Sequence, residues 1–103
     1  MFIGLSNLTH LNLHQNAISF IARGTFAAMS NLQQLVLSSN KLSYLKPGTF
    51  DGLLGLQTLT LTYNQIPELL DGLFSSLRTL TKVSITLTRT RIDQLVNHAV
   101  DLL

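Results

Sequence analysis

Two histidines, His10 and His14, are the residues whose side chains could do chemistry, because an imidazole can bind a metal ion or transfer a proton. They alternate with Leu11 and Leu13, which is typical of a β-strand with one buried and one exposed face. Residues four apart on a strand are separated by about 13 Å, at about 3.3 Å per residue. One metal ion cannot bridge that distance, and the chain contains no cysteine. The sequence therefore predicts no metal site and no cofactor.

Catalysis finds no better support among the acidic residues. We expect these residues to lie in connecting or terminal segments, away from the histidines, so the pattern places no base beside a nucleophile. The acidic residues are Asp51, Glu68, Asp71, Asp93 and Asp101. The sequence predicts a protein that is not an enzyme, and its function must be sought on a surface.

The composition indicates one small globular domain. The 103 residues are 46% hydrophobic and 12% charged, with a formal charge of +2. No apolar run reaches the roughly 20 residues that a membrane-spanning helix needs, and the first ten residues lack the features of a signal peptide. Asn7 begins an Asn-Leu-Thr sequon and is a candidate glycosylation site.

A repeat of 24 residues organises the chain. The segment LTHLNLHQN at residues 8–16 returns as LQQLVLSSN and then as LQTLTLTYN. Each unit begins with a short strand, and the segments between strands are too long for hairpins, so successive strands must be parallel. We divide the array, residues 1–91, into a partial unit 1–7, full units 8–31, 32–55 and 56–79, and a degenerate unit 80–91. One unit cannot bury its own leucines, and stacked units bury them against each other.

Two further columns recur at this period. Buried amides must find hydrogen-bond partners, so the asparagines are predicted to bind backbone groups at the turn after each strand. The phenylalanines are predicted to form a second apolar column. The asparagines are Asn16, Asn40 and Asn64, and the phenylalanines are Phe2, Phe26, Phe50 and Phe74.

The pattern L-x-x-L-x-L-x-x-N-x-[LI]-x-x-[LI]-x-x-x-x-F resembles the leucine-rich repeat family in its 24-residue extracellular form. The resemblance covers about residues 2 to 91. The short array, with its L-x-x-[LI]-x-x-G-x-F segments, is similar to variable lymphocyte receptors and related chordate proteins. It implies a solenoid in a short horseshoe arc, with a parallel β-sheet on the concave face and an irregular, turn-rich convex side. It also implies an asparagine ladder between repeats and an extracellular or cell-surface location.

Residues 92–103 depart from the repeat. Their apolar residues recur at spacings of three and four, which predicts an amphipathic helix that caps the last unit and makes the fold α/β. A helix on a membrane surface is the alternative interpretation. Its polar face is acidic rather than basic, so capping is favoured.

The exposed strand positions form a grid on the concave face. The grid is polar and weakly basic, and Tyr63 beside it is an aromatic anchor of the kind that is common in binding hot spots. Its rows are His10, Gln34, Thr58 and Lys82; Asn12, Val36, Thr60 and Ser84; and His14, Ser38, Thr62 and Thr86. A sheet face is also polar simply because it contacts water, and we favour binding because the family binds there.

A basic patch lies near the last repeat. No acidic residue interrupts Arg78, Lys82, Arg89 and Arg91. Such a patch attracts acidic polysaccharide, lipopolysaccharide phosphate or an acidic protein. Nucleic acid ranks lower, because no recognition motif accompanies the charge.

Two functions remain open. The resemblance implies a non-catalytic immune recognition module that binds a microbial surface glycan or a protein antigen through the grid and the basic patch. The alternative is a structural or adhesion fragment that mediates protein–protein assembly. Its surface would be the convex face or the N-terminal edge, where Phe2 and Leu5 enter the repeat midway and would expose apolar groups to a partner such as a second copy of the chain.

Overall fold

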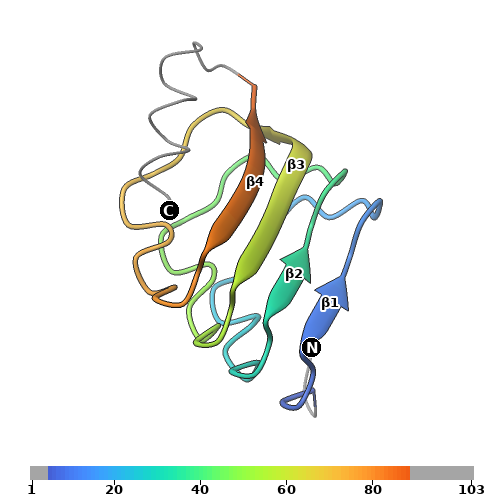
Figure 1. The fold of residues 1–103 in the computed structure, drawn as a ribbon. Coiled ribbons are helices and arrows are strands. Elements are labelled where there is room, and N and C mark those ends of the chain that lie inside the picture. The colour runs from blue at the N-terminus through green and yellow to red at the C-terminus, as the bar shows by residue number, and fades with distance from the viewer. Residues whose placement is uncertain (1–4, 89–103) are drawn as a thin grey trace.

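Four strands form one parallel sheet in a computed structural model, which describes residues 5–88 (Figure 1). The strands follow one another in sequence order and are β1 (His10–Asn12), β2 (Gln34–Val36), β3 (Thr58–Ile66) and β4 (Lys82–Leu87). Their register pairs residues that are 24 positions apart, as in His10 with Gln34 and Leu35 with Leu59. The predicted parallel sheet is confirmed, and the sequence repeat and the sheet register have the same period.

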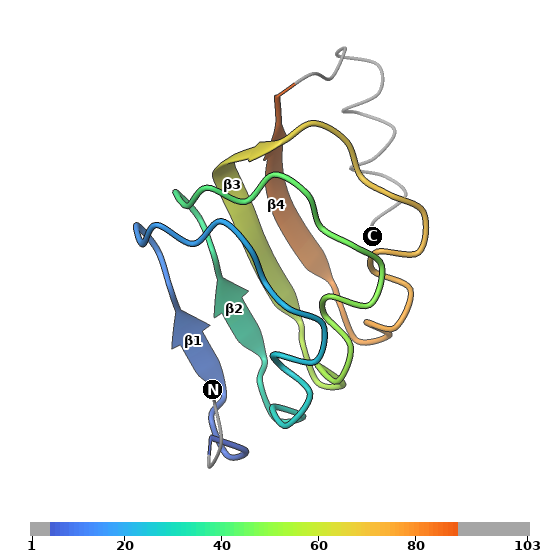
Figure 2. The ribbon, with the colours of Figure 1, turned by 180° about the vertical axis from the view of Figure 1, so that it is seen from behind.

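The core lies between this sheet and the connecting segments, which stack behind it (Figure 2). Leucines on the inner side of the strands, such as Leu35 and Leu59, have no exposed surface. From the connecting segments, Leu42, Phe50 and Leu53 pack into the same cluster and are also fully buried. Each unit therefore closes its core against its neighbours, as the inability of one unit to bury its own leucines requires.

The connecting segments are built from turns. Among residues 5–88 the structure contains no helix, so the irregular side of the repeat is made of successive short turns and extended chain. The predicted capping helix at residues 92–103 falls outside the described residues, and it remains a prediction.

Phenylalanines of successive units stack on each other behind the sheet. The ring centroids of Phe26 and Phe50 are 6.3 Å apart with an interplanar angle of 13°, and those of Phe50 and Phe74 are 6.1 Å apart at 17°. Aromatic pairs at such separations contribute about 0.5–1.5 kcal/mol beyond the area they bury. Phe2, the first member of the predicted column, lies outside the described residues.

The asparagines tie each unit to the one before it. The Nδ2 of Asn64 donates to the carbonyl of Leu37 at 3.0 Å, and its Oδ1 accepts from the backbone N–H of Leu42 at 3.0 Å. Asn40 makes the equivalent contacts with Leu13 and Ile18 at 3.0 and 3.2 Å. Both side chains are only 6% exposed. Each amide therefore satisfies backbone groups that would otherwise be buried without partners.

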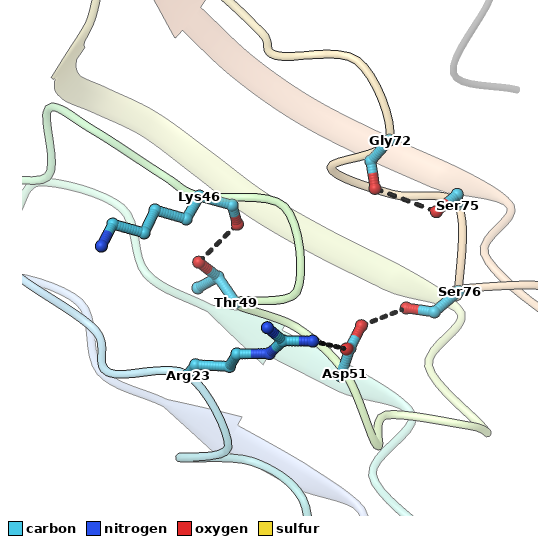
Figure 3. A network of polar contacts seen from close by, with 7 residues as sticks. All are labelled: Arg23, Lys46, Thr49, Asp51, Gly72, Ser75 and Ser76. Carbon is cyan, nitrogen blue, oxygen red and sulfur yellow. Dashed lines mark hydrogen bonds and ion pairs between the residues drawn. The ribbon is translucent and has the colours of Figure 1, made fainter.

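A second set of polar contacts joins the connecting segments (Figure 3). Asp51 accepts a hydrogen bond from the hydroxyl of Ser76 at 3.0 Å and lies 3.9 Å from the guanidinium of Arg23. Three successive units are linked in this way through one carboxylate. The Arg23 and Asp51 side chains are 78% and 47% exposed, so their ion pair contributes little to stability.

Candidate binding face

The solvent side of the sheet carries the predicted grid, and we call it the sheet face. The strand register places the residues of the His10 row and of the Asn12 row side by side across the sheet. Asn12, for example, pairs with Val36, Val36 with Thr60, and Thr60 with Ser84. Exposed members are His10, Asn12, His14, Gln34, Lys82 and Thr86; half-buried members are Val36, Thr58, Thr60, Thr62 and Ser84; Ser38 is buried. These side chains lie on one surface because strand residues alternate between the core and the solvent.

The β1–β2 half of the sheet face is bonded to itself. The Nδ1 of His14 lies 2.6 Å from the hydroxyl oxygen of Ser38, and the Nδ1 of His10 lies 3.0 Å from that of Thr9. The Oδ1 of Asn12 accepts from the backbone N–H of His14 at 2.9 Å. Much of the hydrogen-bonding capacity of this half is therefore already used within the protein.

The sequence pattern places no base beside a nucleophile, whereas the structure brings the imidazole of His14 beside the hydroxyl of Ser38. The two residues are 24 positions apart, so the register alone brings them together. Ser38 is only 6% exposed, and the acidic residues within 5–88, namely Asp51, Glu68 and Asp71, all lie in connecting segments. Within residues 5–88 the pair has no carboxylate to orient the histidine, and the serine hydroxyl is not accessible, so these residues do not form a catalytic triad.

The β3–β4 half is different because its hydroxyls are unused. Among residues 5–88 no hydrogen bond is made by the side-chain hydroxyls of Thr58, Thr60, Thr62, Ser84 and Thr86. A hydroxyl is both a donor and an acceptor, so it can bind amides, sugars or carboxylates without a change of protonation. This half therefore presents hydroxyls that are available for hydrogen bonds to a ligand.

Tyr63 stands at the end of this hydroxyl surface. Its side chain is 73% exposed and its backbone is left-handed, with φ of 59°. Gln15 and Ser39 occupy the same position in earlier units with φ of 56°. The β3–β4 pairing is interrupted between Leu61 and Ile66, around Tyr63. A left-handed conformation costs an L-residue about 1–2 kcal/mol, and such strain is common where a side chain is presented to a ligand.

The charge on this half is positive. Lys82 is exposed on β4, and Arg78 is exposed just before it. Arg89 and Arg91, the other members of the predicted basic patch, lie outside the described residues. With no carboxylate from residues 5–88 on the sheet face, Lys82 is available to an anionic group of a ligand.

The structure also bears on the candidate glycosylation site, on metal-ligating side chains and on membrane-spanning helices. Asn7 is exposed, as a glycosylation site would need to be. Across residues 5–88, no cluster of three or more metal-ligating side chains occurs. The same part of the chain contains no helix that is long and apolar enough to cross a membrane.

The structure also exposes large apolar residues that sequence reasoning missed. Phe20 is 65% exposed and Tyr44 is 59% exposed, at equivalent positions of successive units. Phe20 lines an apolar pocket of about 360 Å³ together with Leu13, Ile18 and Ala22. In the sequence, the only indication of this exposure is that Phe20 and Tyr44 align with Glu68 in the repeat, so the position accepts a charged residue.

Comparison with known proteins agrees with this geometry. The structure is similar to a chain in the structure of the Toll–Spatzle complex, described as a molecular hub in Drosophila development and innate immunity, with a TM-score of 0.60 and 25% identity. The match covers 88% of this chain but 15% of that chain, so this chain spans a small part of that protein's length. Comparison with curated protein sequences gives no significant match. The family model for the leucine rich repeat matches residues 1–42 and 30–92, and the chain therefore belongs to the leucine-rich repeat family.

Proposed function

We propose that this chain is a non-catalytic recognition module that binds a protein antigen or a microbial surface glycan on the β3–β4 half of the sheet face. The observation that carries the proposal is a set of five hydroxyls that make no side-chain hydrogen bond within residues 5–88, beside the exposed ring of Tyr63 and the ammonium group of Lys82. Leucine-rich repeat proteins commonly mediate protein–protein recognition, and the similar Toll–Spatzle structure is associated with innate immunity.

The chemistry of this half favours a hydroxyl-rich or amide-rich ligand. Threonine and serine hydroxyls offer paired donors and acceptors, and an exposed tyrosine packs against the apolar face of a sugar or a side chain. Lys82 adds attraction for an acidic group, which the predicted basic patch would extend toward Arg89 and Arg91. The resemblance to variable lymphocyte receptors and the extracellular or cell-surface location belong to this proposal.

A structural or adhesion role is the second candidate. It is favoured by the apolar pocket and the exposed Phe20, which lie at the β1 end of the array and outside the sheet face. This role needs a partner at that end rather than on the sheet face. The two candidates can therefore be distinguished, because substitutions at the β1 end would weaken partner binding in this role, and substitutions on the sheet face would weaken it in the first.

Co-sedimentation with Gram-negative and Gram-positive cells across a salt series tests the first candidate. We expect binding that weakens as salt rises, because the attraction to Lys82 is screened. Lys82→Gln is expected to weaken binding about two- to five-fold, in line with the modest strength of exposed charge pairs. Lys46→Gln is the matched control, because Lys46 is exposed in the connecting segment between β2 and β3. Absence of binding to any cells, or equal losses in the two variants, would contradict the proposal.

A further inference from the structure

The unused hydroxyls of the β3–β4 half lie in rows along two neighbouring strands. Their residues, which we call the hydroxyl track, are Thr58, Thr60, Thr62, Ser84 and Thr86. Thr60 pairs with Ser84 across the two strands. Neighbouring strands are about 4.8 Å apart, and successive residues on one face of a strand are about 6.6 Å apart. The track is therefore narrow across the strands and about 13 Å long from Thr58 to Thr62.

The β2 side of the track offers no free hydroxyl. Thr60 pairs there with Val36, whose side chain is apolar. Ser38, the equivalent of Thr62 one unit earlier, is buried and lies 2.6 Å from the imidazole of His14. A ligand that uses the free hydroxyls must therefore lie along β3 and β4, which run side by side, rather than extend toward β2 (Figure 1). This arrangement favours an elongated ligand.

The hydroxyl rows have the spacing of an extended polypeptide. Alternate residues of a β-strand point to the same side, so the rows repeat every two residues. An extended peptide laid along the track has the same repeat, and its alternate side chains stay in step with the rows over the whole length. Thr58 and Thr60 are half-buried, and each offers a methyl group beside its hydroxyl. The track can therefore contact both the polar and the apolar parts of a peptide.

The two ends of the track favour different side chains. At one end, Lys82 pairs with Thr58 and is exposed. The acidic residues within 5–88 all lie in connecting segments, and none of them forms an ion pair with Lys82. At the other end, Tyr63 follows Thr62 directly, and its ring is 73% exposed. One end is therefore cationic and the other is aromatic.

On the basis of the proposed function, we infer that the ligand of this half is an extended peptide segment, with an acidic side chain at Lys82 and an aromatic or large aliphatic side chain against Tyr63. The ends of the track are about 13–16 Å apart, and an extended chain rises about 3.3 Å per residue. The two anchoring side chains are therefore about four or five residues apart in the ligand. A polar side chain between them lies over Thr60 and Ser84, where it exchanges hydrogen bonds with their hydroxyls.

Selection from a library of random peptides displayed on phage tests this ligand class without knowledge of the natural ligand. Against the unmodified chain, we expect the recovered peptides to share Asp or Glu and an aromatic or large aliphatic residue, about four or five positions apart. Selection against Lys82→Gln should lose the acidic residue and keep the aromatic one, and selection against Tyr63→Ala should do the reverse. Lys46→Gln is the matched control and should recover the full pattern, because Lys46 is exposed in a connecting segment.

A synthetic peptide with the recovered pattern gives the quantitative test. Its affinity, measured by fluorescence anisotropy, is expected to fall about two- to five-fold with Lys82→Gln, as for an exposed charge pair. The same substitution should not change the affinity of a peptide whose acidic residue is replaced by its amide, because the charge pair is then already absent. Moving the acidic residue next to the aromatic one should also abolish the effect of Lys82→Gln. Circular dichroism checks that each variant is folded.

The outcomes separate this inference from the proposed function. Recovered peptides without a preferred spacing, or an equal effect of Lys82→Gln on the acidic and amide peptides, would overturn the inference. Cells that are bound through Tyr63 and Lys82 while no peptide is recovered would also overturn it, and would leave the proposed function with a glycan as the ligand. Peptides of the expected pattern without binding to any cells would support the ligand class and contradict a microbial source.

Discussion

Replacing Asn64 with alanine is expected to lower the free energy of unfolding by about 4 kcal/mol. The amide group of Asn64 reaches the carbonyl of Leu37 in the preceding unit and accepts from the N–H of Leu42. It also donates within its own unit to the carbonyls of Leu61 and Thr62 at 3.2 and 3.3 Å. Alanine would leave these groups in a site that is closed to water, and each unsatisfied buried group costs about 1–3 kcal/mol.

Asn16 is the matched control for this prediction. It occupies the same place in the first full unit but is exposed, and within residues 5–88 its Nδ2 donates only to the carbonyls of Leu13 and His14 of its own unit. Asn16→Ala should cost about 1 kcal/mol or less, because water can replace the amide. Urea unfolding followed by circular dichroism measures both losses. Equal losses would show that the contact between units, which distinguishes Asn64, does not stabilise the fold.

Gly52→Ala is expected to cost about 3 kcal/mol for a different reason. The φ of Gly52 is +97°, and a Cβ atom there would lie 2.5 Å from the Cα of Ala27 and 2.9 Å from its carbonyl oxygen. Both atoms belong to the backbone of the preceding unit, so the clash can be relieved only by moving the two units apart. Overpacking costs about 1–3 kcal/mol, and the positive φ adds about 1–2 kcal/mol.

Gly24→Ala separates these two contributions. Gly24 has a φ of +84°, but no atom lies within 4 Å of the position that a Cβ would take. Its replacement should cost only the conformational part, about 1 kcal/mol. Thermal unfolding of the two variants gives the difference. Similar losses for Gly24→Ala and Gly52→Ala would mean that the close approach of Gly52 to Ala27 is not maintained in solution.

The sheet register could be predicted from the sequence because one period governs it. Leucines that recur every 24 positions must share one core, and this requirement alone aligns His10 with Gln34 and then with Thr58. The identity of the exposed residues in each row follows from the alternation of strand side chains. The fold and the set of residues on the sheet face can therefore both be predicted from the 24-residue pattern.

The division of that face into two halves could not be predicted in the same way. Ser38 and Thr62 occupy equivalent positions in the repeat, yet Ser38 is bonded to His14 while Thr62 has no side-chain partner among residues 5–88. The difference depends on which residue happens to stand one strand earlier. The repeat identifies a row of candidates, whereas the open hydroxyls become visible only when neighbouring side chains are placed.

Gly52 illustrates a second limit. The repeat aligns it with Ala28 and Ser76, so the pattern marks it as a variable position. Its importance comes from the approach of Ala27 in the preceding unit, which is a contact between backbones and leaves no trace in residue types. The left-handed conformation of Tyr63 could not be predicted either, because glycine and asparagine are the residues that usually indicate a positive φ.

The central claim is that a ligand binds the β3–β4 half of the sheet face, and a pair of tyrosines tests it most directly. Tyr63 and Tyr44 are 73% and 59% exposed, but only Tyr63 adjoins the open hydroxyls, whereas Tyr44 lies in the connecting segment after β2. The measurement is the affinity of Tyr63→Ala and Tyr44→Ala for the cells that co-sediment with the unmodified chain. Loss of about 2 kcal/mol, or roughly 30-fold, in Tyr63→Ala with no change in Tyr44→Ala is the predicted result. Unchanged binding by Tyr63→Ala, or equal losses in both variants, would contradict the account.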